Sequence, residues 1–264
     1  MIQKTTSAVY SRRRILSLFG AAVVGGFAPG RELLAMGPND RVSMSILRYD
    51  SPGWNPRPAA LTRLLLEVQK RTSIEVSSDI SVVSASGGEL YRNPFLVIGG
   101  DRGFKPWPDT WIEELRQFVK IGGFVFVDSA EGVMDGPFLT SIRREMRRVF
   151  PQRQSAPIAY DQVIYKSFYL VERALGRIAV SDKLEGIWED DRLCVVLSQN
   201  DMLGAWSRNP FGQWDYDCTP GGDRQREQSY RLGINLVMYA LCVNYKSDQV
   251  HVPFILNRRN WRID

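Results

Sequence analysis

The chain has 264 residues, of which 44% are hydrophobic and 24% are charged. This length buries the core of one globular domain, or of two small ones at most. The glycine and cysteine contents and the modest net charge exclude a collagen, a disulfide scaffold and wholesale disorder. The formal net charge of +5 invites a nucleic-acid interpretation, so its distribution along the chain has to be examined first.

The first 37 residues have the pattern of an export signal. Arg12 and Arg13 match the twin-arginine motif, and an apolar run extends from Ile15 to about Ala28. That run is shorter than the roughly 20 apolar residues of a membrane span. We therefore expect export to the periplasm, with cleavage after Ala28 or Gly37 and membrane contact only before cleavage. An uncleaved basic helix or anchor is the alternative.

Removing this segment removes most of the net charge. Residues 1–37 hold five basic residues and one acidic residue, so the remaining 227 residues carry 29 basic and 28 acidic side chains. The mature protein is then almost neutral. This balance and the periplasmic address exclude nucleic acid as the expected partner.

Three cysteines are present, Cys194, Cys218 and Cys242. Their odd number and wide spacing argue against a disulfide framework or a zinc site. Cys194 and Cys242 lie in apolar runs and are predicted to be buried, whereas Cys218 lies in a polar loop as the candidate reactive thiol. One disulfide stays open as an alternative in an oxidising compartment.

Strand and helix patterns alternate along the rest of the chain, without an internal repeat. A capping box at Thr110 and Glu113 predicts one helix start, and Asp190 with Asp191 predicts a hairpin turn. Such alternation predicts one three-layer α/β domain with a largely parallel sheet over residues 38–252, followed by a tail over 253–264. Strands are expected over 42–49, around 74–76, and over 95–100, 124–127, 184–189 and 192–198, with helices around 61–68 and over 110–121, 137–149 and 225–244.

Several motifs occur in a fixed order at 93–100, 122–128, 143–151, 184–187, 199–202 and 231–235. Together they resemble the bacterial domain-of-unknown-function family 4159 over about residues 41 to 252. The resemblance implies a flavodoxin-like fold related to the class I glutamine amidotransferases. It implies no activity.

The catalytic triad of an amidotransferase is missing from this chain. That chemistry needs a cysteine nucleophile, a histidine base and a carboxylate that orients the base. Ser129 stands where the nucleophile would follow its strand, and Asn200 and Asp201 follow the strand that would deliver the histidine. Neither has the near-neutral pKa of a base, and the only histidine, His251, lies in the tail. Ser129 also lacks the surrounding glycines of a nucleophile elbow.

Four aspartates each follow an apolar, strand-like run. Because ligands in open α/β sheets bind outside the carboxyl ends of the strands, these acids mark a candidate ligand edge. They would hold Mg²⁺ or Ca²⁺ or bind sugar hydroxyls, or else they are ordinary turn and helix-cap residues. No metal site is assigned, and no nucleotide motif or cofactor is found. The candidate ligand-binding residues at this edge are Asp50, Gly99, Gly100, Asp101, Arg102, Asp128, Asn200 and Asp201.

A loop over residues 199–223 adds two further candidate ligand contacts, Trp206 and Trp214. Aromatic rings beside Asp215 and Asp217 suit a saccharide site, a protein-docking surface or a structural lid, and all three interpretations stay open. The helix over 137–149 carries four arginines that are predicted to form a solvated face, namely Arg143, Arg144, Arg147 and Arg148. An anionic wall polymer or a membrane surface is the alternative partner of this face.

Two functional hypotheses follow. The first is an exported, non-catalytic binding or adaptor protein of the cell envelope, with an envelope protein or glycan as its partner. The alternative is a hydrolase of envelope glycan or peptide that uses Asp128, Glu131 or Asp201, or less directly Ser129. Paired carboxylates about 5 to 10 Å apart hydrolyse glycosides without cysteine or histidine. Burial of Asp128 and Asp201 in ion pairs would contradict that alternative. The oligomeric state is not predicted.

Overall fold

The computed structural model describes residues 41–86 and 88–243, which contain one sheet of seven strands in the order β2-β1-β3-β4-β7-β6-β5. The five strands from β2 to β7 run parallel, and β6 and β5 are antiparallel to their neighbours. The prediction of a largely parallel α/β sheet is confirmed. The strands are β1 (Ser45–Leu47), β2 (Ser81–Val83), β3 (Phe95–Gly100), β4 (Phe124–Ser129), β5 (Ala156–Pro157), β6 (Glu185–Glu189) and β7 (Arg192–Ser198).

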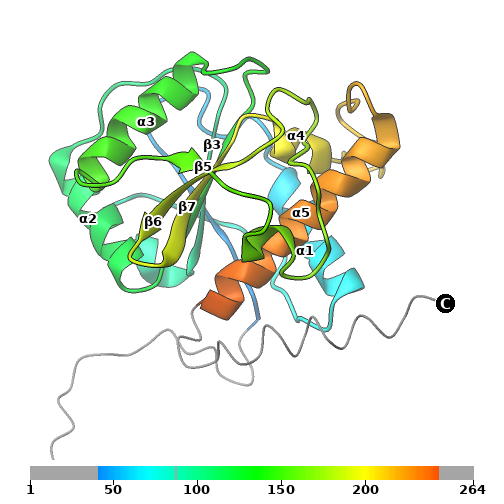
Figure 1. Ribbon diagram of the computed structural model, residues 1–264, viewed down its shortest axis with the longest axis horizontal. Helices are drawn as coiled ribbons and strands as arrows, with labels where there is room; N and C mark the ends of the chain where they lie inside the picture. The colour runs from blue at the N-terminus through cyan, green and yellow to red at the C-terminus, as the bar shows by residue number, and fades with distance from the viewer. Residues whose placement is uncertain (1–40, 87, 244–264) are drawn as a thin grey trace, which may run out of the picture. The chain divides into compact units, whose positions relative to one another are not determined.

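Helices cover both faces of this sheet. Figure 1 shows α2 and α3 on one side of the strands, and α1 and α5 on the other. No helix in the described part of the chain is both long and apolar enough to cross a bilayer. The helices are α1 (Ala60–Arg71), α2 (Asp109–Lys120), α3 (Pro137–Val149), α4 (Met202–Trp206) and α5 (Gly222–Val243), with 3₁₀ turns η1 (Glu89–Arg92) and η2 (Val163–Tyr165).

The central strands are apolar throughout because both of their faces are buried. Alternate side chains of a strand point to opposite faces, so Phe95 and Val97 pack in the core under α1 and α5. Leu96 and Ile98 pack in the second core, under α2 and α3. An uninterrupted apolar run is what a parallel strand between two helical layers requires.

The edge of the sheet differs from the prediction. The segment around 74–76, predicted to be a strand, contributes only an isolated bridge between Val42 and Val76. The strand at this edge of the sheet is β2, which begins at Ser81. With only Ser81, Val82 and Val83 paired to β1, and with Val82 half exposed, β2 is too short to show a periodic pattern. Sequence periodicity therefore misses it.

The start of α2 also differs. The helix begins at Asp109 after an N-cap at Pro108, and no side chain caps it. Thr110 lies inside the first turn, while the Glu113 carboxylate accepts a hydrogen bond from Gln117 at 3.0 Å and pairs with Arg116. Pro108 holds the extended backbone from which the helix starts, so the predicted capping box does not form.

The arginines of α3 do not form a solvated face. Glu145 is fully buried in this helix and pairs with Arg144 at 2.5 Å and with Arg148. Arg143 pairs with Glu185 of β6 at 2.5 Å. A buried carboxylate needs cations beside it, so three of the four arginines stabilise the domain and only one remains exposed.

Other boundaries agree more closely. The helix α3 has the predicted ends, and β6 and β7 form a hairpin that turns at Asp190 and Asp191, where Asp190 has a φ of 52°. The loop over 199–223 contains α4, and α5 begins a few residues earlier than predicted. The predicted signal peptide, both cleavage sites and His251 lie outside the described residues.

Candidate functional site

The carboxyl ends of the parallel strands bring the predicted aspartates to one edge of the sheet, but they do so in different environments. Asp128 is the penultimate residue of β4, and its neighbour in the sheet is Ser198 of β7. The β7 strand leads directly into Asp201, whose backbone N–H donates to the Ser129 carbonyl at 3.1 Å. Asp50 and Asp101 follow β1 and β3. The two pairs must therefore be considered separately.

The Asp128 carboxylate caps a helix. It is buried, and its oxygens accept hydrogen bonds from the backbone N–H groups of Met202 at 3.1 Å and Leu203 at 2.8 Å. These are the first two residues of α4, whose N–H groups have no partner within the helix. Burial, followed by the nearby charge of Asp201, raises the pKa of Asp128 to about 7.

Asp201 is the centre of an ion cluster and has no exposed surface. Arg57 donates from Nε to Oδ1 at 3.1 Å and from Nη2 to Oδ2 at 2.7 Å, and Arg177 also donates to Oδ2. The carboxylate further accepts the Gly204 N–H at 3.0 Å. A Cβ on Gly204 would lie 2.4 Å from Oδ2, so only glycine fits there. Every oxygen of Asp201 is already in use.

Arg57, Arg177 and Tyr216 were not predicted. The guanidinium carbon of Arg57 lies 3.9 Å from the centre of the Tyr216 ring, and that of Arg177 lies 6.0 Å away. A buried aspartate implies a cation beside it. Because Arg57 is 144 positions from Asp201 along the chain, no spacing rule could have identified it.

The Ser129 and Glu131 side chains also support the backbone. Ser129 is buried, and its hydroxyl donates to Glu131 Oε2 at 3.1 Å. Glu131 Oε1 accepts the backbone N–H of Phe138 at 2.8 Å, in the first turn of α3. No imidazole lies beside Ser129 within the described residues. This pair therefore closes the turn between β4 and α3.

Asn200 and the two glycines hold packing positions. The buried Asn200 amide accepts the N–H groups of Val180 and Ser181 and fixes that loop. A Cβ on Gly100 would lie 2.2 Å from the Phe138 ring, and one on Gly99 would lie 3.2 Å from Leu203. The close approach that the two glycines permit is to side chains of α3 and α4.

The loop over 199–223 packs its aromatic residues against the domain. Trp206 is completely buried in the core, and this burial argues against its predicted role as a ligand contact. Trp214 is half buried between the guanidinium groups of Arg208 at 3.5 Å and Arg226 at 4.0 Å. Of the three interpretations, the contacts favour the structural lid.

Cys218 in the same loop is buried rather than reactive. Burial raises its thiol pKa, which reduces the thiolate fraction that a nucleophile needs. Cys194 is likewise buried, as predicted, and Cys242 is half buried. All three are free thiols in the described part of the chain.

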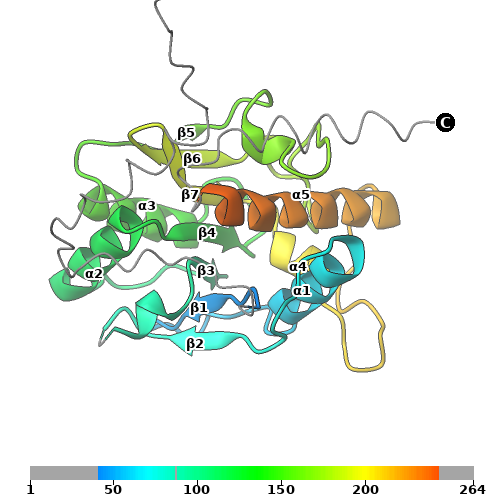
Figure 2. The same ribbon diagram turned by 90° about the horizontal axis from the view of Figure 1, so that it is seen from below.

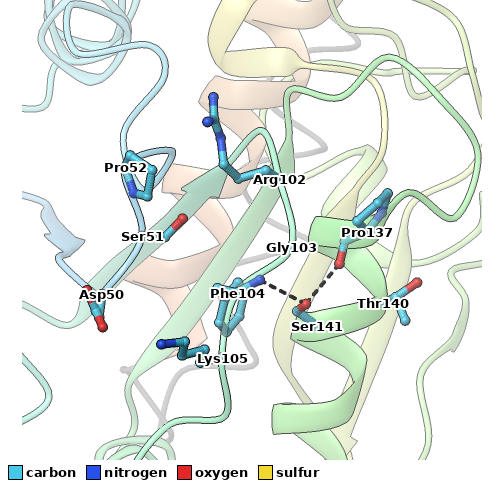
Figure 3. A pocket seen from close by; sticks show the side chains of 10 residues that line it. All are labelled: Asp50, Ser51, Pro52, Arg102, Gly103, Phe104, Lys105, Pro137, Thr140 and Ser141. Atoms are coloured by element: carbon cyan, nitrogen blue, oxygen red, sulfur yellow. Dashed lines mark hydrogen bonds between the residues drawn. The ribbon is translucent and has the colours of Figure 1, made fainter.

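Asp50 lies at the open part of the sheet edge. Two cavities, of about 620 and 860 Å³, meet at residues 50–52 after β1, and we call them together the cleft. The smaller cavity lies between this segment, the loop after β3 and the start of α3, and its charged and hydroxyl groups are those of Asp50, Ser51, Arg102, Lys105, Thr140 and Ser141 (Figure 3). The larger cavity lies between β1, β2 and α2, and its lining includes Arg48, Asp50, Trp54, Val82, Glu89 and Trp111.

Some polar side chains that line the cleft are held by hydrogen bonds or ion pairs within the protein, and others are not. Ser141 Oγ accepts the Phe104 N–H at 3.2 Å and donates to the Pro137 carbonyl at 2.9 Å, as Figure 3 shows. Arg102 pairs with Asp101 at 2.7 Å. By contrast, no side-chain hydrogen bond or ion pair within the described residues involves the charged groups of Arg48, Asp50, Glu89 or Lys105.

Within residues 41–86 and 88–243, no cluster of three histidine, cysteine or acidic side chains has the geometry of a metal site. The chemistry available in the cleft is hydrogen bonding to hydroxyl, amide and charged groups, together with stacking on indole rings.

These features define an α/β domain with a largely parallel sheet and open cavities at the carboxyl ends of its strands. The chain belongs to the family described as Domain of unknown function (DUF4159), whose model matches residues 43–241. The match runs from just before β1 into the last turn of α5 and confirms the family resemblance. A comparison with curated proteins found no match.

The raised pKa of Asp128 predicts a pH-dependent stability. The carboxyl group stays protonated in the folded state up to about pH 7, but ionises near pH 4 when unfolded. The unfolded state therefore binds fewer protons between these values, and stability falls as pH rises from about 4 to about 7.

Urea unfolding of the wild type and of Asp128→Asn across this range measures the effect. We expect the variant to be less stable at pH 4, because an amide nitrogen cannot accept a backbone N–H, but to lose the downward slope. Equal slopes in the two proteins would contradict the assignment.

Proposed function

We propose that the protein is an exported, non-catalytic binding protein of the cell envelope, whose ligand occupies the smaller cavity of the cleft. One contrast carries this proposal. Asp128 and Asp201, the acids on which a hydrolase would depend, are buried with their oxygens in use. Asp50 and Lys105 of the cavity are exposed and have no partner within the described residues.

The position of the cleft supports a binding role. The order β2-β1-β3-β4-β7 matches the 2-1-3-4-5 order of flavodoxin-like sheets, in which ligands bind where the strand order reverses. Here the reversal falls between β1 and β3, the strands whose following loops line the smaller cavity. We therefore propose a flavodoxin-like domain of amidotransferase ancestry that lacks the triad.

An envelope glycan is the ligand class that fits this cavity best. Figure 3 shows Asp50, Ser51 and Lys105 on one side of the cavity and Thr140 on the other. The cavity has a volume of about 620 Å³. Hydroxyl, carboxylate and ammonium groups of this kind satisfy the many hydrogen bonds of a sugar. We therefore propose that the glycan binds in the smaller cavity of the cleft and not on the aromatic loop over residues 199–223.

Export is part of the same proposal and rests on Arg12 and Arg13. Replacing both with lysine should retain the precursor in the cytoplasm, as cell fractionation would measure. Secretion of that double variant at the wild-type level would contradict the twin-arginine route.

Titration calorimetry with the N-acetylglucosamine–N-acetylmuramic acid disaccharide tests the binding site. We expect saturable binding that Asp50→Asn and Lys105→Ala each weaken roughly 10- to 100-fold, because a hydrogen bond to a charged group contributes about 1.5–3 kcal/mol. Lys120→Ala, at an exposed lysine outside the cleft, is the matched control and should bind normally.

Two outcomes would overturn the proposal. If no saturable binding is seen at millimolar sugar, the glycan is excluded as the ligand. Release of new reducing ends from a glycan polymer would restore the hydrolase alternative.

A further inference from the structure

Residues 208–214 form a rigid projection that we call the finger. Arg208 and Trp214 form an antiparallel bridge at its base. At its tip, the Asn209 side-chain oxygen accepts the N–H groups of Phe211 and Gln213, both at 3.0 Å, and Gly212 has a φ of 82°. Glycine suits position 212 because it adopts a positive φ without strain.

The base of the finger is braced from both sides. The Trp214 ring lies between the guanidinium groups of Arg208 and Arg226, at 3.5 and 4.0 Å. Arg63 of α1 donates to the Asn209 carbonyl at 3.2 Å. The conformation is thus held by the protein's own contacts, so that little order would have to be gained on binding.

Phe211 stands at the tip with 89% of its surface exposed, more than Leu170, the next most exposed large apolar side chain of the described residues, at 73%. The backbone that carries this ring is held by Asn209, and phenylalanine is among the residues that are enriched at protein interfaces.

We propose that the finger docks into the larger cavity of a second copy of the chain, with Phe211 between its tryptophans. The cavity is about 860 Å³ and offers the indole rings of Trp54 and Trp111 together with Val82. An aromatic ring packs favourably against such rings.

Charge favours the same occupant. The finger is flanked by the cations Arg63 and Arg208 against one acid, Asp215, whose carboxylate accepts a hydrogen bond from Ser207. The cavity instead carries Asp50 and Glu89 against the single cation of Arg48. Neither acid has a partner within the described residues. Placing the finger in the cavity therefore brings opposite charges together around an apolar centre.

The contact must be between copies. The finger lies beside α1, while Trp111 of α2 lines the cavity, and Figure 2 shows the segment between α4 and α5 away from α2. Each copy would use its finger on one neighbour and its cavity on another, which is a head-to-tail arrangement that closes into rings or extends into chains.

Sedimentation equilibrium of the full chain tests this proposal. The wild type should associate with increasing concentration. Phe211→Ser removes the finger contact and Glu89→Lys reverses a cavity charge, so each should raise the dissociation constant at least tenfold. Leu170→Ser, at another exposed apolar residue, should associate like the wild type.

A mixture of the two defective variants provides the decisive measurement. The Phe211→Ser copy keeps an intact cavity and the Glu89→Lys copy keeps an intact finger, so together they should form a 1:1 dimer and nothing larger. A monomeric wild type, or a Phe211→Ser variant that associates normally, would overturn the proposal. Asp50 lines both cavities, but Lys105 lines only the smaller one, so the Lys105→Ala arm of the glycan titration is independent of the association of copies.

Discussion

Asp201→Asn should lower the free energy of unfolding by about 3 kcal/mol or more, because breaking a buried ion pair leaves the partner charge uncompensated. Asparagine keeps the size of the side chain and tolerates the φ of 51° at this position. The substitution removes the charge and replaces one acceptor oxygen with an NH2 group, and it leaves Arg57 and Arg177 beside a neutral amide. Urea unfolding at pH 7 measures the loss.

Asp101→Asn is the matched control for this experiment. It breaks an ion pair of the same type, Asp101 with Arg102, whose side chains are 31% and 56% exposed. Exposed pairs contribute about 1 kcal/mol or less, so the control should lose little. If the two variants lost equal stability, the cluster around Asp201 would not be structural, and its carboxylate would again be a candidate catalytic group.

This cluster explains why one residue pattern supports two opposite functional hypotheses. An aspartate after a strand is expected both at a ligand edge and at a helix cap. In this protein, Asp128 and Asp201 cap the short helix α4, whereas Asp50 faces the cleft. The difference is made by α4, which covers the ends of β4 and β7 and leaves the end of β1 open.

The central part of the fold could be predicted because its signals are local. The apolar runs of β3 and β4 and the amphipathic pattern of α3 each lie within a few consecutive residues. These elements are long enough for their periods to be recognised. The three-residue strand β2 and the five-residue helix α4 are not, and both were missed.

The site could be predicted only in part, because its contacts are distant in sequence. The order of the strands in the sheet brings Arg57 to Asp201. It also places residues 50–52 where they line both cavities. Trp54, in the loop after β1, and Trp111, in the first turn of α2, both line the larger cavity, and nothing near either residue distinguishes it from a core tryptophan. The aromatic loop carried the stronger sequence signal, yet Trp206 lies in the core.

Trp206→Ala should therefore lower the free energy of unfolding by about 3 to 5 kcal/mol, the loss typical of a large aromatic side chain removed from a core. The indole is completely buried, with the Phe126 ring 6.0 Å and the Tyr230 ring 6.5 Å from it. A Cβ on Gly233 would lie 2.6 Å from Trp206 Cζ2, so α5 approaches this ring as closely as a glycine allows.

Trp214→Ala is the informative comparison, because the two tryptophans lie in the same loop but only Trp206 is in the core. Trp214 is half buried and stacks on two arginines, so its loss should cost about 1 to 2 kcal/mol. Neither residue lines the cleft, and both folded variants should bind the disaccharide like the wild type. A Trp214→Ala protein that folds normally but no longer binds sugar would place the glycan on the loop rather than at the ends of β1 and β3.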